Sequence, residues 1–197
     1  MLHLSPTDVG HYFEKLGIPS KFGATEVREL ETQPLRHREG FMTFPTPRDN
    51  EALTVLGLRE QLGVDPEHAP SIFDHSWYLE EGFGKVSCAP GWHQLAMDVW
   101  PDSIARPVYH AEDLKREALY LPTATEVLLM LFLNFARNGE RLLLRKHTWT
   151  RDRTETTEAP RLVSIGAFGK KGVFVSSHEV GYKSRGLGIC PTANPFS

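Results

Sequence analysis

The segment TATEVLLMLFLNFARNG, residues 123–139, constrains the fold more than any other region of the chain. Thr123 and Glu126 have the spacing of a helix capping box, and Gly139 stands where helix C-termini favour glycine. The run between them is apolar on most sides, which is typical of a buried helix. Its longest apolar stretch, residues 127–133, is far shorter than the ~20 residues of a membrane span. We therefore predict a helix over 123–138 at the centre of the fold and no association with a membrane.

The period of the apolar residues changes after this helix. Three segments of strand-like composition follow: RLLLRKHTWT (141–150), APRLVSIGAF (159–168) and GVFVSSH (172–178). A lone hairpin buries too little surface to be stable, so we predict an antiparallel meander of these strands packed on the central helix. The Gly/Pro-rich tail, 181–197, is expected to lie over an edge of the sheet.

The sequence predicts that the N-terminal region of the chain is mainly helical. Apolar residues at helical spacing predict short helices over 7–16 and 25–32, and a third that Asp49 caps and Gly63 ends. The segment GWHQLAMDVW (91–100) alternates like a strand, and 110–119 reads as a short polar helix. The predicted fold class is α+β: a C-terminal antiparallel meander on a buried central helix, with N-terminal helices. We expect one globular domain, 1–197, which is helical over residues 1–70 and α+β over residues 71–197.

Composition limits the class of protein. Of the 197 residues 40% are hydrophobic and 24% charged, which is ordinary for a globular domain. The N-terminus lacks the pattern of a signal peptide, so the expected location is cytoplasmic. Cys88 and Cys190 are too few for a disulfide framework, and we expect two small buried residues, with a single bridge between them left open.

The net charge of −3 is unevenly distributed. Residues 1–100 carry 8 Lys/Arg against 15 Asp/Glu, a charge of −7, and residues 101–197 carry 14 against 10, a charge of +4. The basic half could meet an anionic ligand, or the two halves could neutralise each other by packing; the sequence favours the second.

The best candidate for a binding surface lies on the predicted meander. Period two places Leu143, Arg145, His147 and Trp149 in one row, with Arg151 just beyond. Phe174, Ser176 and His178 line one face of the last strand, and Lys183 and Arg185 follow it. If the two faces coincide, they form a basic, aromatic surface for an anionic or stacking ligand. The predicted ligand-binding residues are Arg145, His147, Trp149, His178 and Arg185. The alternative, which the sequence favours, is a solvated outer sheet face with Trp149 packed across strands.

The second candidate is a metal site. Nine histidines are many for this length, and the best local set is Asp74, His75 and His93 with Asp98. His93 and Asp98 point to opposite faces of the predicted strand, so they could not bind one ion there. Cys88 would be a reactive thiol only if a histidine lay beside it and it were partly exposed; His93 is five residues further on.

No catalytic signature is present, neither a nucleophile elbow nor a Walker loop nor a zinc-protease motif. The sequence therefore predicts a non-catalytic ligand-binding or interaction module. The alternative is a metal-dependent or hydrolase-like enzyme that uses Asp74, His75 and His93. No cofactor is predicted. If Phe41, Phe44 and Phe196 are exposed, they could form the subunit interface of a homo-oligomer.

Three C-terminal segments carry a resemblance: GERL at 139–142, the VSIGAF run with its following Gly and Val around 163–175, and GLGICP at 186–191. Together they resemble a family of uncharacterised bacterial proteins without an established activity. The resemblance implies a recurring domain and no particular chemistry. In that family the stretch before the closing glycines is rich in Asn and Asp, whereas here it reads SSHEVGYKSR.

Overall fold

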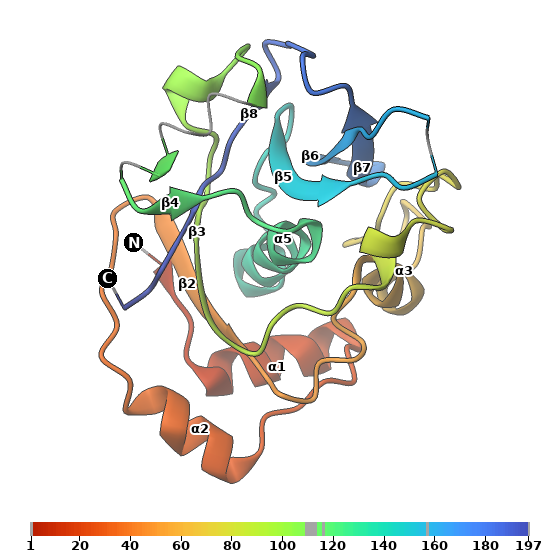
Figure 1. The fold of residues 1–197 in the computed structure, drawn as a ribbon. Coiled ribbons are helices and arrows are strands. Elements are labelled where there is room, and N and C mark those ends of the chain that lie inside the picture. The colour runs from red at the N-terminus through yellow and green to blue at the C-terminus, as the bar shows by residue number, and fades with distance from the viewer. Residues whose placement is uncertain (1, 109–113, 116, 157, 197) are drawn as a thin grey trace.

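Helix α5, Ala124–Asn138, lies at the centre of the fold, with a β-sheet on either side (Figure 1). The fold is seen in a computed structural model that describes residues 2–108, 114–115, 117–156 and 158–196. Thr123 and Glu126 form the capping box, and Gly139 ends the helix in the left-handed conformation at φ 75°. Eleven of the fifteen residues of α5 are buried, so the prediction of a buried central helix is confirmed.

The first sheet has the strand order β1-β2-β3-β9-β4. β1 runs parallel to β2, and the other pairs are antiparallel. Its strands are β1 Leu2–His3, β2 Phe41–Thr46, β3 Gly91–Ala96, β4 Leu119–Tyr120 and β9 Thr192–Ala193. The strand predicted over 91–100 is β3, but β2 was missed, because Pro45 and the flanking threonines resemble a loop more than a strand.

The second sheet has the order β7-β6-β5-β8. The meander of β5, β6 and β7 is antiparallel, as predicted, and β8 adds a parallel strand beside β5. Its strands are β5 His147–Arg153, β6 Leu162–Gly169, β7 Gly172–His178 and β8 Leu187–Gly188. The C-terminal tail does not merely cover a sheet edge, since it supplies β8 to this sheet and β9 to the other. The fold class is α+β, as predicted.

Helices α1, α2 and α3 come before β3 in the chain. Helix α1 packs against α5 and α2 follows it at the bottom of Figure 1. The helices are α1 Pro6–Leu16, α2 Ala24–Glu31 and α3 Val55–Leu62, with short 3-10 helices η1 Gly82–Lys85 and η2 Pro101–Ser103. The predicted cap of the third helix is wrong: Thr54, rather than Asp49, accepts the hydrogen bond from Gly57 N–H, at 2.8 Å. The helix predicted over 110–119 lies largely outside the described residues, and Leu119 belongs to β4.

Two hydrophobic cores hold these layers together. The larger one surrounds α5 and includes the β6 and β7 side chains that point toward it, such as Val163, Ile165 and Val175. The smaller one lies on the other face of the second sheet, around Trp149, with Leu162, Leu187 and Ile189. Both cysteines are buried and free, so no disulfide bridge joins them. No helix among the described residues is long and apolar enough to cross a membrane.

Candidate functional site

The two faces that the sequence analysis singled out coincide. His147 on β5 lies opposite Gly166 on β6, which lies opposite Phe174 on β7. Trp149 lies opposite Ser164 and, beyond it, Ser176. Directly opposed residues point to the same side of a sheet, so His147, Trp149, Ser176 and the nearby His178 share one face. The strand itself begins only at His147, because residues 141–146 form turns in which Leu143 has a φ of +52°.

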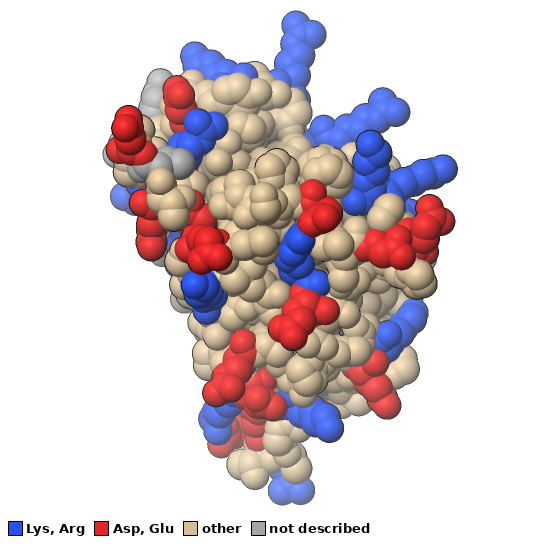
Figure 2. Space-filling view, turned by 90° about the vertical axis from the view of Figure 1, so that its right-hand side faces the viewer, with Lys and Arg blue, Asp and Glu red and all other residues tan. Residues whose placement is uncertain are grey.

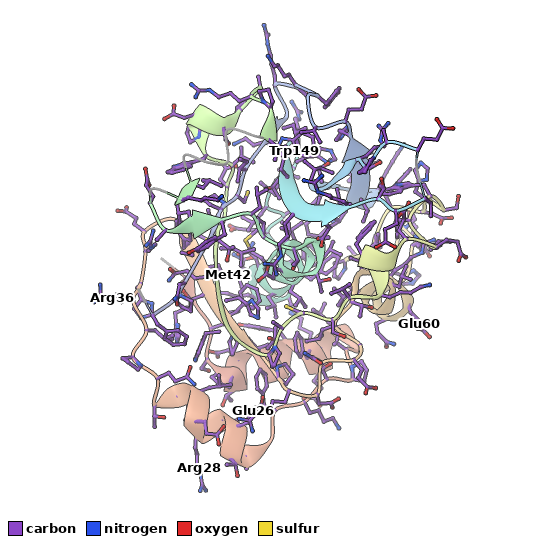
Figure 3. All side chains as sticks on the ribbon, in the orientation of Figure 1. Glu26, Arg28, Arg36, Met42, Glu60 and Trp149 are labelled. Atoms are coloured by element: carbon purple, nitrogen blue, oxygen red, sulfur yellow. The ribbon has the colours of Figure 1, made fainter. Side chains whose placement is uncertain are left out.

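Trp149 does not present its ring to solvent, so the prediction of a ligand-stacking Trp149 is wrong, and the ring is packed as the favoured alternative expected. Its side chain is fully buried in the second core and comes from β5 (Figure 3). The ring stands perpendicular to that of His178, with centroids 5.7 Å apart. The predicted sheet face was expected to be open to water, but β8 and the segment around Leu114 and Leu119 cover it. A ligand therefore cannot stack on Trp149.

Beside the buried tryptophan the same face opens into a pocket of about 240 Å³. Strands β5 and β7 form one wall, and the tail residues before β8 form the other. Tyr182 from the tail stacks on His178, with the ring centroids 4.5 Å apart and the planes nearly parallel. The pocket is lined by Arg145, His147, Ser176, His178, Tyr182, Ser184, Gly186 and Leu187. Arg185 is exposed and does not line it. We call these lining residues the histidine pocket.

One of the lining residues, His147, has a ring nitrogen without a hydrogen-bond partner. Nδ1 of His147 is buried and forms no hydrogen bond. Burial, and then the nearby His178, lowers the pKa of His147 to about 4. Burial and the charge of Arg161 lower the pKa of His178 as well. At neutral pH both imidazoles are therefore uncharged, and Arg145 is the charged side chain among the lining residues. None of those lining residues is a carboxylate.

The three predicted metal ligands do not come together. Asp74 is exposed and accepts a hydrogen bond from Arg59 Nη2 at 2.5 Å. His75 is exposed, whereas His93 is buried between the first sheet and α5. Within the described residues no group of three or more His, Cys, Asp or Glu side chains could hold a metal ion.

His93 instead belongs to a cluster that the sequence analysis did not assemble. Its Nδ1 lies 3.0 Å from Oε1 of Glu126, and its Nε2 lies 3.7 Å from Sγ of Cys88. Burial opposes charge on the ring, but Cys88 and Glu126 hold the pKa of His93 well above its ordinary value. Burial likewise opposes the carboxylate charge, but His93 and the bonds from Thr123 lower the pKa of Glu126 to about 2. The condition set for Cys88 is half met: a histidine lies beside it, but the thiol is 2% exposed.

One signal in the sequence could have pointed to this cluster. The alternation of β3 places His93 on the same side as Leu95, which is the side toward the central helix. A histidine on the face toward an apolar helix needs a polar partner there, and Glu126 is the acidic residue in the first turn of that helix. The capping box predicted the start of the helix but did not by itself connect Glu126 with His93.

One face of the surface carries charges of both signs. Figure 2 shows Lys, Arg, Asp and Glu side chains interspersed over the face that it presents. Of the residues considered for an oligomer interface, Phe44 is fully buried, Phe41 is half-buried and Phe196 is 46% exposed. A homo-oligomer stays a prediction.

Comparison with known proteins gives no further guide: no protein-family model matches the chain, and neither a curated protein nor a solved structure matches it.

Proposed function

We propose that the histidine pocket is a non-catalytic binding site that holds a small anion. The observation that carries the proposal is the unpartnered, buried Nδ1 of His147 in a pocket that Arg145 also lines and no carboxylate lines. A buried polar atom without a partner costs about 1–3 kcal/mol, and a ligand that forms a hydrogen bond with it removes that cost.

The charges of the pocket favour an anion whose binding is coupled to uptake of protons by the two histidines. Arg145 supplies a permanent positive charge with several N–H donors. His147 and His178 are neutral before binding because their pKa values are lowered. A bound anion stabilises the charged form of both rings, so it raises their pKa values and draws protons into the pocket.

The size of the pocket and the burial of Trp149 limit the ligand. About 240 Å³ is below the 300–1,000 Å³ of most sites for drug-sized molecules, so the ligand is a small oxyanion or a short carboxylate. Single-stranded nucleic acid requires exposed aromatic platforms in a basic groove. Trp149 does not offer one, although Tyr182 is 44% exposed.

Inorganic sulfate is a suitable probe, because its charge stays constant between pH 5 and 8. We expect a sulfate titration at fixed ionic strength, followed by NMR of the histidine rings, to perturb His147 and His178. Affinity should rise as the pH falls from 7 to 5, by up to about tenfold per pH unit for each proton taken up. Arg145→Gln should weaken binding at least tenfold.

Lys171→Gln is the matched control. Lys171 is an exposed cation in the turn between β6 and β7 and does not line the pocket. Its replacement removes the same charge and should change sulfate affinity by less than about twofold. Equal losses in the two variants, or shifts confined to other histidines, would show that sulfate senses only the net charge, and the proposal would be wrong.

A further inference from the structure

We propose that Cys88, His93 and Glu126 form a second site, a thiol centre in which Cys88 is the nucleophile for acyl compounds. The three residues come from different elements: Cys88 from the segment after η1, His93 from β3 and Glu126 from the first turn of α5. They stand in the order nucleophile, base and orienting carboxylate that thiol acyl transfer requires. This site lies on the first sheet and does not depend on the histidine pocket.

The hydrogen bonds fix the protonation of His93. Nδ1 faces the Glu126 carboxylate at 3.0 Å, so it carries a hydrogen. Nε2 lies 2.9 Å from the carbonyl oxygen of Ala89, which can only accept, and 2.9 Å from Thr46 Oγ1, whose hydroxyl donates to that same carbonyl. A hydrogen on Nε2 therefore satisfies both contacts, and the raised pKa of His93 agrees with an imidazolium. A cation 3.7 Å from Sγ of Cys88 stabilises the thiolate, which is the reactive form of cysteine.

Glu126 is held in place by its own bonds. Thr123 N–H and the Thr123 hydroxyl donate to its second oxygen, Oε2, at 2.6 and 3.0 Å, which leaves Oε1 directed at His93. Phe44 stacks on the imidazole ring of His93. Asp152 is a further charged group of this region: its Oδ2 accepts from Ala124 N–H at 2.5 Å, and its charge interacts with that of Glu126. Glu126 is thus a positioning residue.

A short surface segment covers the thiol. Residues 86–90 contain no helix or strand, and Val86 is 56% exposed while Cys88 is 2% exposed. Hydrogen bonds to neighbouring elements hold the segment: Asn50 Nδ2 donates to Cys88 O at 2.6 Å, Cys88 N–H donates to Leu53 O at 2.8 Å, and Ala89 O accepts from Thr46 Oγ1 at 2.6 Å and from His93 Nε2 at 2.9 Å. Irregular surface segments open locally more often than the whole domain unfolds. Reagents would reach Cys88 through such openings.

The proposed step balances without a cofactor. The Cys88 thiolate attacks the carbonyl carbon of an ester or thioester, and a new S–C bond forms as the bond to the leaving group breaks. The leaving group departs with the proton from Nε2 of His93. Water then gives a proton back to this nitrogen and hydrolyses the thioester, which releases a carboxylic acid and restores the thiolate–imidazolium pair.

The full chain provides an internal standard, because Cys190 is the only other cysteine. Burial raises the pKa of Cys190 to about 12, so this thiol should stay inert. We expect 4-nitrophenyl acetate to acetylate Cys88 at least tenfold faster than Cys190, as measured by peptide mass spectrometry. A second probe, iodoacetamide, should label Cys88 at a rate that changes less than about twofold between pH 6 and 8. The rate for an ordinary thiol rises about tenfold per pH unit in this range.

Two variants test the components of the centre. Glu126→Gln should restore a steep rise of the alkylation rate with pH, which a purely structural glutamate would not cause in protein that is still folded. Asn50→Ala removes one bond of the covering segment and should accelerate labelling by up to about tenfold without changing the pH profile, since it alters only the opening.

The decisive comparison requires no variant. If the wild-type protein labels Cys88 and Cys190 at equal rates, or labels Cys88 with the pH profile of an ordinary thiol, then Cys88, His93 and Glu126 are a structural contact and the proposal is overturned. Neither result affects the sulfate experiment on the histidine pocket.

Discussion

His93 and His147 lie on central strands of the two sheets. They differ in the hydrogen-bond partners of their rings and in the direction in which the protein shifts their pKa values. Both ring nitrogens of His93 have partners, and Cys88 and Glu126 hold its pKa well above the ordinary value. Nδ1 of His147 is buried without a partner, and burial lowers the pKa of this residue to about 4. Near neutral pH one ring is therefore charged and the other neutral. The charge of each histidine therefore depends on whether a carboxylate from a distant element reaches its ring, and not on the strand that carries it.

The same contrast extends to the neighbouring residues. Six side-chain polar atoms among the described residues are buried without a hydrogen-bond partner, and three of them lie on β5 and β6: His147 Nδ1, Trp149 Nε1 and Ser164 Oγ. Native structures leave few such atoms unpaired, and a cluster of them often marks a functional site. Both ring nitrogens of His93 have partners at the junction of β3 and α5, whereas the face of β5 and β6 retains unmet hydrogen-bonding capacity.

The largest effect should come from breaking the satisfied pair. Glu126→Gln leaves the His93 cation buried without its counter-charge and weakens the capping box of α5. Removal of one partner of a buried ion pair costs about 3–5 kcal/mol, so we expect a loss of this size in the free energy of unfolding, measured with urea at pH 7.

Glu29→Gln serves as the control for that measurement. Glu29 also forms an ion pair, with Arg48 at 2.6 Å, but both side chains are largely exposed. Its loss should change the free energy of unfolding by less than about 1 kcal/mol. If the two variants were equally stable, the junction of β3 and α5 would hold no buried ion pair, and the contrast between the two histidines would fail.

The second prediction concerns acid. In the unfolded chain His147 takes up a proton near pH 6.5, whereas in the folded protein it does so near pH 4. The unfolded state therefore binds more protons between these values, and stability falls as the pH falls through this window, by about 3 kcal/mol in all. Glu126 contributes to the acid loss of stability only at lower pH. Its pKa is 4.5 in the unfolded chain and about 2 in the folded protein, so its contribution is lost as the pH falls from 4.5 toward 2.

Urea titrations at pH 7.5 and 4.5 check this prediction. His147→Gln should lose about 2 kcal/mol less than the wild type between the two pH values. His93 has the opposite sign: its pKa is raised on folding, so its contribution is complete below pH 6.5 and is lost as the pH rises through the folded value. An equal acid loss in the wild type and in His147→Gln would mean that His147 is not held neutral.

Local patterns in the sequence predicted the elements that depend on neighbouring residues alone. The capping box and the apolar run specified α5, and the alternation along β6 and β7 specified the meander and the shared face of His147 and His178. Two features were not local. The burial of Trp149 depends on β8 and on residues around Leu119, which reach that face from distant regions of the chain. The contact of His93 with Glu126 joins positions 33 residues apart, and no spacing rule connects a strand to the first turn of a later helix.

A smaller effect should come from one satisfied hydroxyl in the second sheet. Oγ1 of Thr148 accepts from Cys190 N–H at 2.7 Å and donates to the Trp149 carbonyl, all in the interior. Thr148→Val keeps the shape of the side chain but leaves Cys190 N–H buried without a partner. We expect a loss of about 1–3 kcal/mol in the free energy of unfolding at pH 7. A loss below about 0.5 kcal/mol would show that water or backbone movement satisfies this N–H.

The smallest effect should come from the neighbouring strand. Ser164 is fully buried, lies opposite Trp149, and its hydroxyl has no partner. Ser164→Ala removes a polar group that gains nothing in the folded state, so stability should be unchanged or rise by up to about 1 kcal/mol. The comparison with Thr148→Val isolates the value of the partner, because both residues are buried hydroxyls in the same sheet. A clear loss of stability in Ser164→Ala would reveal a bound water at this face, and the difference between the two regions would then lie in hydration.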